Sequence, residues 1–168
     1  MNAYLYRPTI TFASTNIVGN VYFANFVSWQ GACREMFLKD HAPGVLRMVA
    51  DHRIILHTSR VTCEFTDPVG ASLDDDIVLE MTLKHLRGGR MTVAFGYFRE
   101  ATGHNGTPRT QIASGEQSLC CKRVSEDGLV PTVFPVELLR ALRQFTDSPE
   151  ILEHIDEATA FAAKRAGV

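Results

Sequence analysis

The stretch 15–37, TNIVGNVYFANFVSWQGACREMF, holds the residues whose types and spacing could do chemistry. Asn16 lies in a loop rich in Asn and Gly, and Arg34 stands in the apolar helix predicted to follow. An asparagine side chain both donates and accepts hydrogen bonds, so it can polarise a carbonyl or hold a water. A guanidinium offers a fork that suits a carboxylate or a β-dicarbonyl group.

Each of these two residues also has a structural interpretation. Asn16 could be a turn or helix-cap residue, which is common in Asn/Gly loops. Arg34 follows Gln30 by four residues and Phe26 by eight, on an otherwise apolar stripe. Because arginine is almost never buried without a partner, it could pair with a carboxylate on a strand or in a neighbouring subunit. The candidate carboxylates are Glu64, Glu80 and Glu116.

The elements that must position these residues follow from periodicity and turn residues. We expect a strand at 4–12, a helix from near Val21 to Lys39 closed by HAPG, and a short helical segment after it. Alternating residues predict strands at 54–65, 76–86, 90–100 and 109–123, with a hairpin at Gly88-Gly89 and a loop at 101–108. Helices are expected at about 135–145 and 149–166. This order predicts an α+β fold, with a curved antiparallel sheet of about five strands wrapped on one long helix.

The long helix is apolar nearly all round, which predicts that it is buried on every side. Gly31 costs helix stability on the order of 1 kcal/mol relative to Ala. We therefore expect that this position needs space for a close approach of the sheet.

Length, charge and motifs limit the function classes. A chain of 168 residues fits one domain, which we divide into a core at 1–146 and a C-terminal helical extension at 147–168. The net charge of −2 disfavours nucleic acid, and no apolar run of about 20 residues predicts a membrane span. The N-terminus lacks the pattern of a signal peptide, so a cytoplasmic protein with four reduced cysteines is expected. The spacing of the histidines predicts no metal site, and no other cofactor is expected. No G-x-S-x-G motif is present, which argues against a nucleophilic serine.

The motif T-N-x-x-G-N-V-Y-F-A-N-F, followed by an apolar helix ending in R-E-M-F, resembles the hot-dog-fold thioesterases of the 4-hydroxybenzoyl-CoA type. Among them it is most similar to those associated with enediyne polyketide synthases, and the resemblance covers residues 4–145. The matching residues are Asn16, Gly19, Asn20, Val21, Tyr22, Phe23, Asn25, Trp29, Gln30, Gly31, Cys33, Arg34, Glu35, Met36 and Phe37.

The resemblance implies an unusual site, because the two acids of the wider family are missing. Asn16 stands where the catalytic aspartate usually lies, and Gly31 where another branch has a glutamate. In the enediyne-type members an asparagine and an arginine are held responsible for catalysis, and Asn16 and Arg34 match them. The family also implies dimers or tetramers, with the site at a subunit interface.

Thioester hydrolysis needs a polarised carbonyl, a place for negative charge on its oxygen, and a positioned water. The unpaired N–H groups at a helix N-terminus suit the oxyanion, so we expect it near Gly19, Asn20, Val21 and Tyr22. A long polyene needs a narrow apolar channel, which the side chains of the helix could line, although each could equally be core. The candidate channel residues are Phe23, Phe26, Trp29, Gln30 and Phe37.

The leading hypothesis from the sequence is a thioesterase that releases a polyene β-ketoacyl or β-hydroxyacyl group from the acyl carrier protein of an enediyne polyketide synthase. Loss of CO₂ from the freed acid is a further step that the family suggests. Three alternatives stay open: an acyl-CoA thioesterase for a small aryl or fatty acyl group, a hot-dog hydratase or dehydratase, and a protein that binds a polyketide without cutting it.

Overall fold

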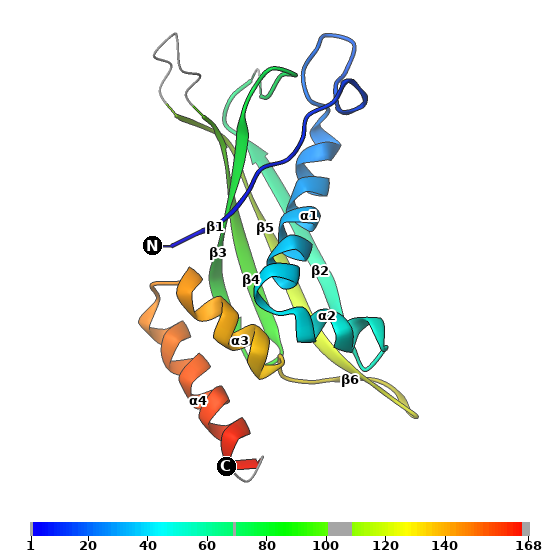
Figure 1. Cartoon of the computed structure of the whole chain (residues 1–168), viewed down its shortest axis with the longest axis vertical. Coiled ribbons are helices and arrows are strands. Elements are labelled where there is room, and N and C mark those ends of the chain that lie inside the picture. Colours follow the sequence, from blue (N-terminus) through cyan, green and yellow to red (C-terminus); the bar gives the residue numbers. More distant parts are fainter. Residues whose placement is uncertain (1, 69, 101–108, 166–168) are drawn as a thin grey trace.

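The structure, a computed structural model, describes residues 2–68, 70–100 and 109–165, with side chains in the last helix described to residue 162 (Figure 1). The helices are η1 (Phe12–Ser14), α1 (Phe23–His41), α2 (Pro43–Ala50), α3 (Val136–Leu142), η2 (Arg143–Phe145) and α4 (Pro149–Arg165). The strands are β1 (Tyr4–Tyr6), β2 (Ile54–Phe65), β3 (Ile77–Arg87), β4 (Arg90–Arg99), β5 (Thr110–Ser125) and β6 (Gly128–Pro131). The predicted loop at 101–108 lies outside the described residues.

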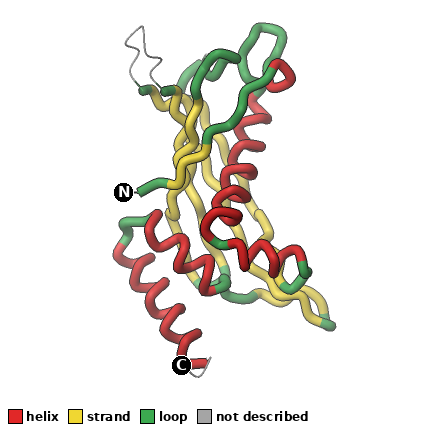
Figure 2. The backbone as a smooth tube through the Cα atoms, viewed as in Figure 1, coloured by secondary structure: helices red, strands yellow, loops and turns green. Residues whose placement is uncertain are grey.

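The strands form one antiparallel sheet in the order β1-β3-β4-β5-β2, with the short β6 pairing with the end of β5. Figure 2 shows α1 running along one face of this curved sheet, with α2 and α3 near the C-terminal end of α1. This layout confirms the predicted α+β hot-dog fold. No helix in the described part of the chain is long and apolar enough to cross a membrane.

The alternation in the central strands places one set of side chains against α1. Met91, Val93, Phe95 and Tyr97 of β4 are all buried, as every second residue of a half-buried strand should be. The β3–β4 hairpin turns at Gly88-Gly89 as predicted, and Gly88 has a φ of +57°, which glycine adopts readily. These strands make the rigid wall on which the site is built.

Several predicted boundaries were wrong. The first strand stops at Tyr6 instead of residue 12, because Pro8 has no N–H to continue the ladder and the chain then forms η1. The segment after β5, where no strand was predicted, contains β6, and Gly128 makes the hairpin with a φ of +112°. Helix α1 begins two residues later than predicted and ends two residues later.

The prediction that α1 is buried on every side was also wrong for a single chain. Phe26, Cys33 and Phe37 are buried, but Phe23 is 59% exposed, and Val27 and Met36 are exposed as well. Phe23 and Val27 lie one turn apart on one flank of α1, whereas Met36, nine residues after Val27, projects from the opposite flank. Apolar side chains of α1 are therefore left on the surface.

The close approach of helix and sheet occurs at Gly115 of β5, and the prediction for Gly31 was wrong. A Cβ built on Gly31 meets nothing within 4 Å, whereas one on Gly115 would lie 2.2 Å from Gln30 Nε2 and 2.5 Å from the Thr62 carbonyl oxygen. The absent side chain of Gly115 therefore makes room for Gln30, whose Nε2 donates to the Thr62 carbonyl at 2.9 Å.

The C-terminal helices pack on each other and on β3. Ile151 and Ile155 of α4 are buried, and the Arg143 guanidinium donates from two nitrogens to the Asp156 carboxylate, at 3.1 Å each. The backbone N–H of Gly88 donates to His154 Nε2 at 3.2 Å, which joins α4 to the β3–β4 hairpin.

Candidate active site

Arg34 reaches from α1 toward the inner face of the sheet. Its Nη1 donates to Thr58 Oγ1 on β2 at 2.7 Å and to Gln117 Oε1 on β5 at 3.0 Å. Within the described residues, no carboxylate lies within 4 Å of it. Of the carboxylates proposed as partners, Glu80 pairs with Arg109 and Glu116 with Lys84. The chain therefore holds this guanidinium with neutral acceptors.

The electrostatic state of Arg34 follows from this setting. Burial lowers the pKa of the guanidinium, and the nearby Glu35 carboxylate opposes the shift. Arginine stays protonated even so. A partly buried cation without a charged partner is poorly solvated, which makes it receptive to an incoming anion.

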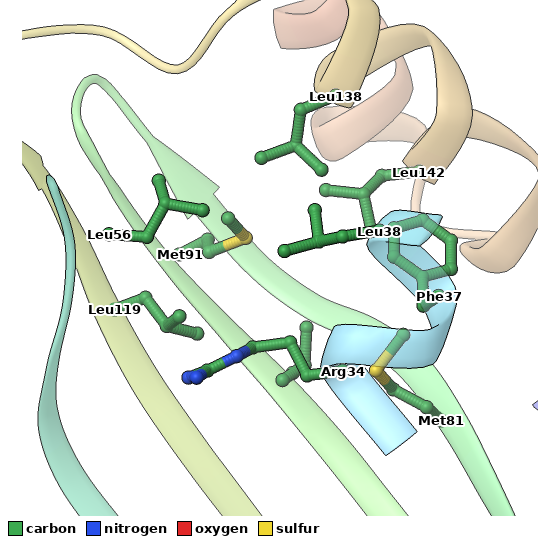
Figure 3. Close-up of a pocket in the computed structure, with 10 residues that line it drawn as sticks. Arg34, Phe37, Leu38, Leu56, Met81, Met91, Leu119, Leu138 and Leu142 are labelled. Carbon is green, nitrogen blue, oxygen red and sulfur yellow. The ribbon is translucent and has the colours of Figure 1, made fainter. Parts of the chain in front are cut away.

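A narrow apolar space, here called the inner cavity, lies beside Arg34. Figure 3 shows side chains of α1, α3 and the sheet converging on it, and Arg34 is the one charged residue of its lining. Its volume is about 20 Å³, enough for roughly one water molecule. The lining residues are Arg34, Phe37, Leu38, Leu56, Met81, Met91, Val93, Leu119, Leu138 and Leu142.

A wider space, here called the outer groove, lies between α1, α2 and β2. It has a volume of about 410 Å³. Arg34, Leu38 and Leu56 line both the groove and the inner cavity, so they stand where the two spaces meet. Its other lining residues are Glu35, Met36, Lys39, Leu46 and Val49. A chain that entered by the groove would pass the guanidinium before reaching the apolar interior.

Asn16 is exposed and organises the loop that precedes α1. Its Oδ1 accepts from the N–H groups of Val18 at 3.0 Å and Asn20 at 3.1 Å, and its backbone N–H donates to the Asn20 carbonyl at 2.7 Å. The structural interpretation of Asn16, as a turn residue, therefore accounts for the hydrogen bonds of its side-chain oxygen. In the part of the chain described here, Nδ2 of Asn16 makes no hydrogen bond, so this donor is unused.

The N–H groups predicted for the oxyanion are all engaged in this conformation. Gly19 donates to the Asn16 carbonyl at 3.0 Å, Asn20 to Asn16 Oδ1, Val21 to the Ala71 carbonyl at 2.7 Å, and Tyr22 to the Ser14 carbonyl at 2.8 Å. Tyr22 is the N-cap of α1, and the next N–H groups, of Phe23 and Ala24, have no acceptor among the described residues. The open donors of the helix N-terminus therefore lie one to two residues beyond the predicted set.

One chain does not bring Asn16 and Arg34 together. Arg34 follows Phe23 by eleven residues, a distance of about 16 Å along the helix axis. Figure 1 shows the Asn16 loop at one end of α1 and helices α2 and α3 near the other. Asn16 lines neither the inner cavity nor the outer groove.

Comparison with solved structures identifies the family. A crystal structure of the dynemicin thioesterase, from a study of polyene binding, is 42% identical over 86% of this chain and 97% of its own, with a TM-score of 0.78. The chain belongs to the hot-dog-fold thioesterases. Its resemblance to the enediyne-type members is thereby confirmed, and it is a thioester hydrolase.

More distant structures show the same fold. The 4-hydroxybenzoyl-CoA thioesterase of Pseudomonas sp. strain CBS-3 is 17% identical over 84% of this thioesterase and 99% of its own chain, with a TM-score of 0.68. The 1,4-dihydroxy-2-naphthoyl-CoA thioesterase of Synechocystis is 16% identical over 88% and 100%, with a TM-score of 0.67. No protein-family model and no curated protein matches the sequence.

Of the predicted channel residues in this thioesterase, only Phe37 lines the inner cavity. Phe26 is core, with its ring centroid 5.0 Å from that of Trp29 and 5.3 Å from that of Tyr97. Gln30 is fully buried against the sheet, and its Oε1 has no hydrogen-bond partner among the described residues. Phe23 lies on the exposed face of α1.

The residues that hold Arg34 were not predicted from the sequence. Gln117 is 3% exposed and follows Gly115 by two positions on β5, so it points to the same inner face. A polar residue on the inward period of a buried strand is the signal that could have found it. Thr58 was harder to predict, because a register shift in β2 between Thr58 and Arg60 changes which side chains face inward.

The cysteines show no sign of a reactive thiol. Burial raises the pKa of the Cys33 thiol to about 12 and that of Cys121 to about 11. Cys120 is only partly buried while Cys121 is buried, because neighbours on a strand face opposite sides of the sheet.

Proposed function

We propose that this thioesterase hydrolyses a polyene β-ketoacyl or β-hydroxyacyl thioester carried by the acyl carrier protein of an enediyne polyketide synthase. The observation that carries the proposal is the Arg34 guanidinium, which stands without a carboxylate partner in the described chain where the outer groove meets an apolar cavity. A cation at the mouth of an apolar channel suits an acyl chain with a polar β-substituent next to its thioester.

The small inner cavity implies that the substrate opens its own space. A volume of about 20 Å³ cannot hold a polyene, so the walls must move on binding. Met81 and Met91 line the cavity, and methionine side chains change rotamer easily. Crystal structures of the dynemicin thioesterase revealed induced-fit effects upon polyene binding. That behaviour supports the same expectation here.

The site is completed by a second copy of the chain. Arg34 and the inner cavity come from one subunit, while Asn16 and the open N–H groups of Phe23 and Ala24 come from its partner. Two observations support this arrangement: Asn16 and Arg34 stand far apart within one chain, and the apolar side chains of Phe23 and Val27 on α1 are exposed.

The residues then divide the reaction between them. The N–H groups at the α1 N-terminus stabilise the oxyanion that forms when water attacks the thioester carbon, a contribution of about 10²–10³ in rate for each donor. Asn16 Nδ2 orients the carbonyl or the water, and Arg34 holds the β-oxygen. The C–S bond breaks, and the proton of the attacking water passes to the leaving thiolate. A freed β-keto acid can then lose CO₂ while Arg34 binds its carboxylate. A tetramer and a cytoplasmic location stay predictions.

The test is mass spectrometry of the product released from a polyene-loaded carrier protein, beside the same assay with aryl-CoA and fatty acyl-CoA thioesters. We expect release of a polyene β-hydroxy or β-keto acid, or the corresponding ketone or hydrocarbon, much faster than cleavage of the CoA esters. Faster cleavage of an aryl-CoA would favour the acyl-CoA thioesterase instead. Tight polyene binding with no product would favour a carrier role.

A further inference from the structure

Helix α3 closes one side of the inner cavity. Leu138 and Leu142, each 2% exposed, contribute to its lining, one helical turn apart. In the view of Figure 3, Leu138 lies at one end of the group of side chains and Arg34 at the other, with Leu38 and Met91 between them. A chain that passes Arg34 and extends through the cavity therefore ends against α3.

A second layer, α4, holds α3 in this place. Leu139, next to Leu138 in sequence, points about 100° away from it round the helix and lines a surface pocket with Ala158 and Phe161 of α4. The buried Ile155, the Arg143–Asp156 ion pair and the bond from Gly88 N–H to His154 tie α4 to α3 and to the β3–β4 hairpin. Moving α3 outward would break these contacts, whereas the methionine walls can adjust by changing rotamer.

We propose that Leu138 and Leu142 form the closed end of the acyl channel and set the longest chain that the enzyme accepts. This inference rests on the proposed function, because it takes the inner cavity as the acyl site. An extra carbon at the end of the chain must displace a leucine backed by α4, so affinity should fall sharply beyond one length. A channel that ended in flexible side chains would show a gradual decline.

The test compares three variants of neighbouring leucines. Leu138→Ala and Leu142→Ala each remove three carbons from the proposed end, so the preferred acyl length should rise by about two or three carbons. Leu139→Ala makes an equal deletion from a 3% exposed residue of α3 that does not line the inner cavity, and its preferred length should stay that of the wild type. Leu138→Phe should shorten the preferred length. The readout is kcat/KM for straight-chain acyl groups of increasing carbon number, each loaded on the same acyl carrier protein.

Two outcomes would overturn the proposal: an unchanged length preference in Leu138→Ala, Leu142→Ala and Leu138→Phe, or an equal shift in Leu139→Ala. Calorimetric binding of free fatty acids of graded length separates it from the proposed function. A binding optimum that moves with Leu138 in a protein that cleaves no thioester would refute the function and keep the length limit. Thioester cleavage by an enzyme whose optimal fatty-acid length does not change in the Leu138 variants would keep the function and refute the length limit. If an alanine variant fails to fold, Leu142→Val and Leu138→Phe still give a shift in opposite directions.

Discussion

Arg34 is held by two uncharged acceptors, and this choice of partners has a consequence for chemistry. Thr58 and Gln117 fix the orientation of the guanidinium without cancelling its charge. A carboxylate at the same distance would stabilise the cation and would also compete with any anionic group of a substrate. A partly buried guanidinium without a counter-charge is destabilising. We attribute its presence to the use of this charge in binding substrate.

The substitution Gln117→Glu tests this point. It would place a carboxylate beside Arg34 Nη1, where Gln117 Oε1 now lies at 3.0 Å. We expect the free energy of unfolding to change little, because the ion pair offsets the desolvation of the new charge, while kcat/KM for the β-ketoacyl thioester falls by about tenfold or more, the value of one charged hydrogen bond. Urea unfolding and steady-state kinetics measure the two effects.

The matched control is Gln117→Leu, which removes the acceptor without adding charge. It should lower the free energy of unfolding by about 1–3 kcal/mol, because it leaves part of the buried guanidinium unsatisfied. A Gln117→Glu enzyme with undiminished activity would show that the net charge of Arg34 is not used in binding.

At the scale of elements, the contact between α1 and β5 depends on one missing side chain. Gly115→Ala would force the new Cβ to within 2.2 Å of Gln30 Nε2, so we expect a loss of about 1–3 kcal/mol or more from overpacking. Gly31→Ala adds a methyl group to open space in a helix and should gain about 0.5–1 kcal/mol. The midpoint of denaturant unfolding, compared at an unchanged m-value, measures the change in stability of both variants. A destabilising Gly31→Ala variant would show that a neighbouring subunit fills that space.

The sequence predicted which elements exist far better than what they touch. Strand β2 was placed at its observed bounds, 54–65, because β-branched residues and a following Asp-Pro define it clearly. Periodicity could not tell which aromatic residues of α1 face a cavity, since Phe26 and Phe37 are both buried and only the position of α3 makes Phe37 a lining residue. The leucines of α3 lie about a hundred residues after Arg34, and nothing local in the sequence links them to it.

For the whole molecule, exposed apolar side chains on α1 and β2 predict self-association. Phe23 and Val27 are exposed on one flank of α1, and Val61 and Phe65 on the neighbouring edge strand β2. An open edge strand beside exposed apolar residues of a helix is a surface that proteins commonly cover with another subunit. We expect the chain to form dimers, or tetramers built from them.

Light scattering after size-exclusion chromatography measures this directly. Wild type should have at least twice the mass of the chain, and a charge among these exposed apolar residues, as in Val27→Lys, should shift it toward monomer. Phe161→Glu, at an exposed phenylalanine of α4, should keep the wild-type mass. A monomeric wild type would remove the basis for a site shared between subunits.

The most direct test of the shared site is complementation between two inactive variants. Asn16→Ala and Arg34→Ala are each expected to lose about 10² or more in the single-turnover rate of thioester hydrolysis. When the two chains are co-expressed and assemble at random, about a quarter of the sites combine an intact Asn16 from one copy with an intact Arg34 from the other. A site shared between subunits predicts recovery of about that fraction of wild-type activity. Mixed assemblies as inactive as either parent would contradict it.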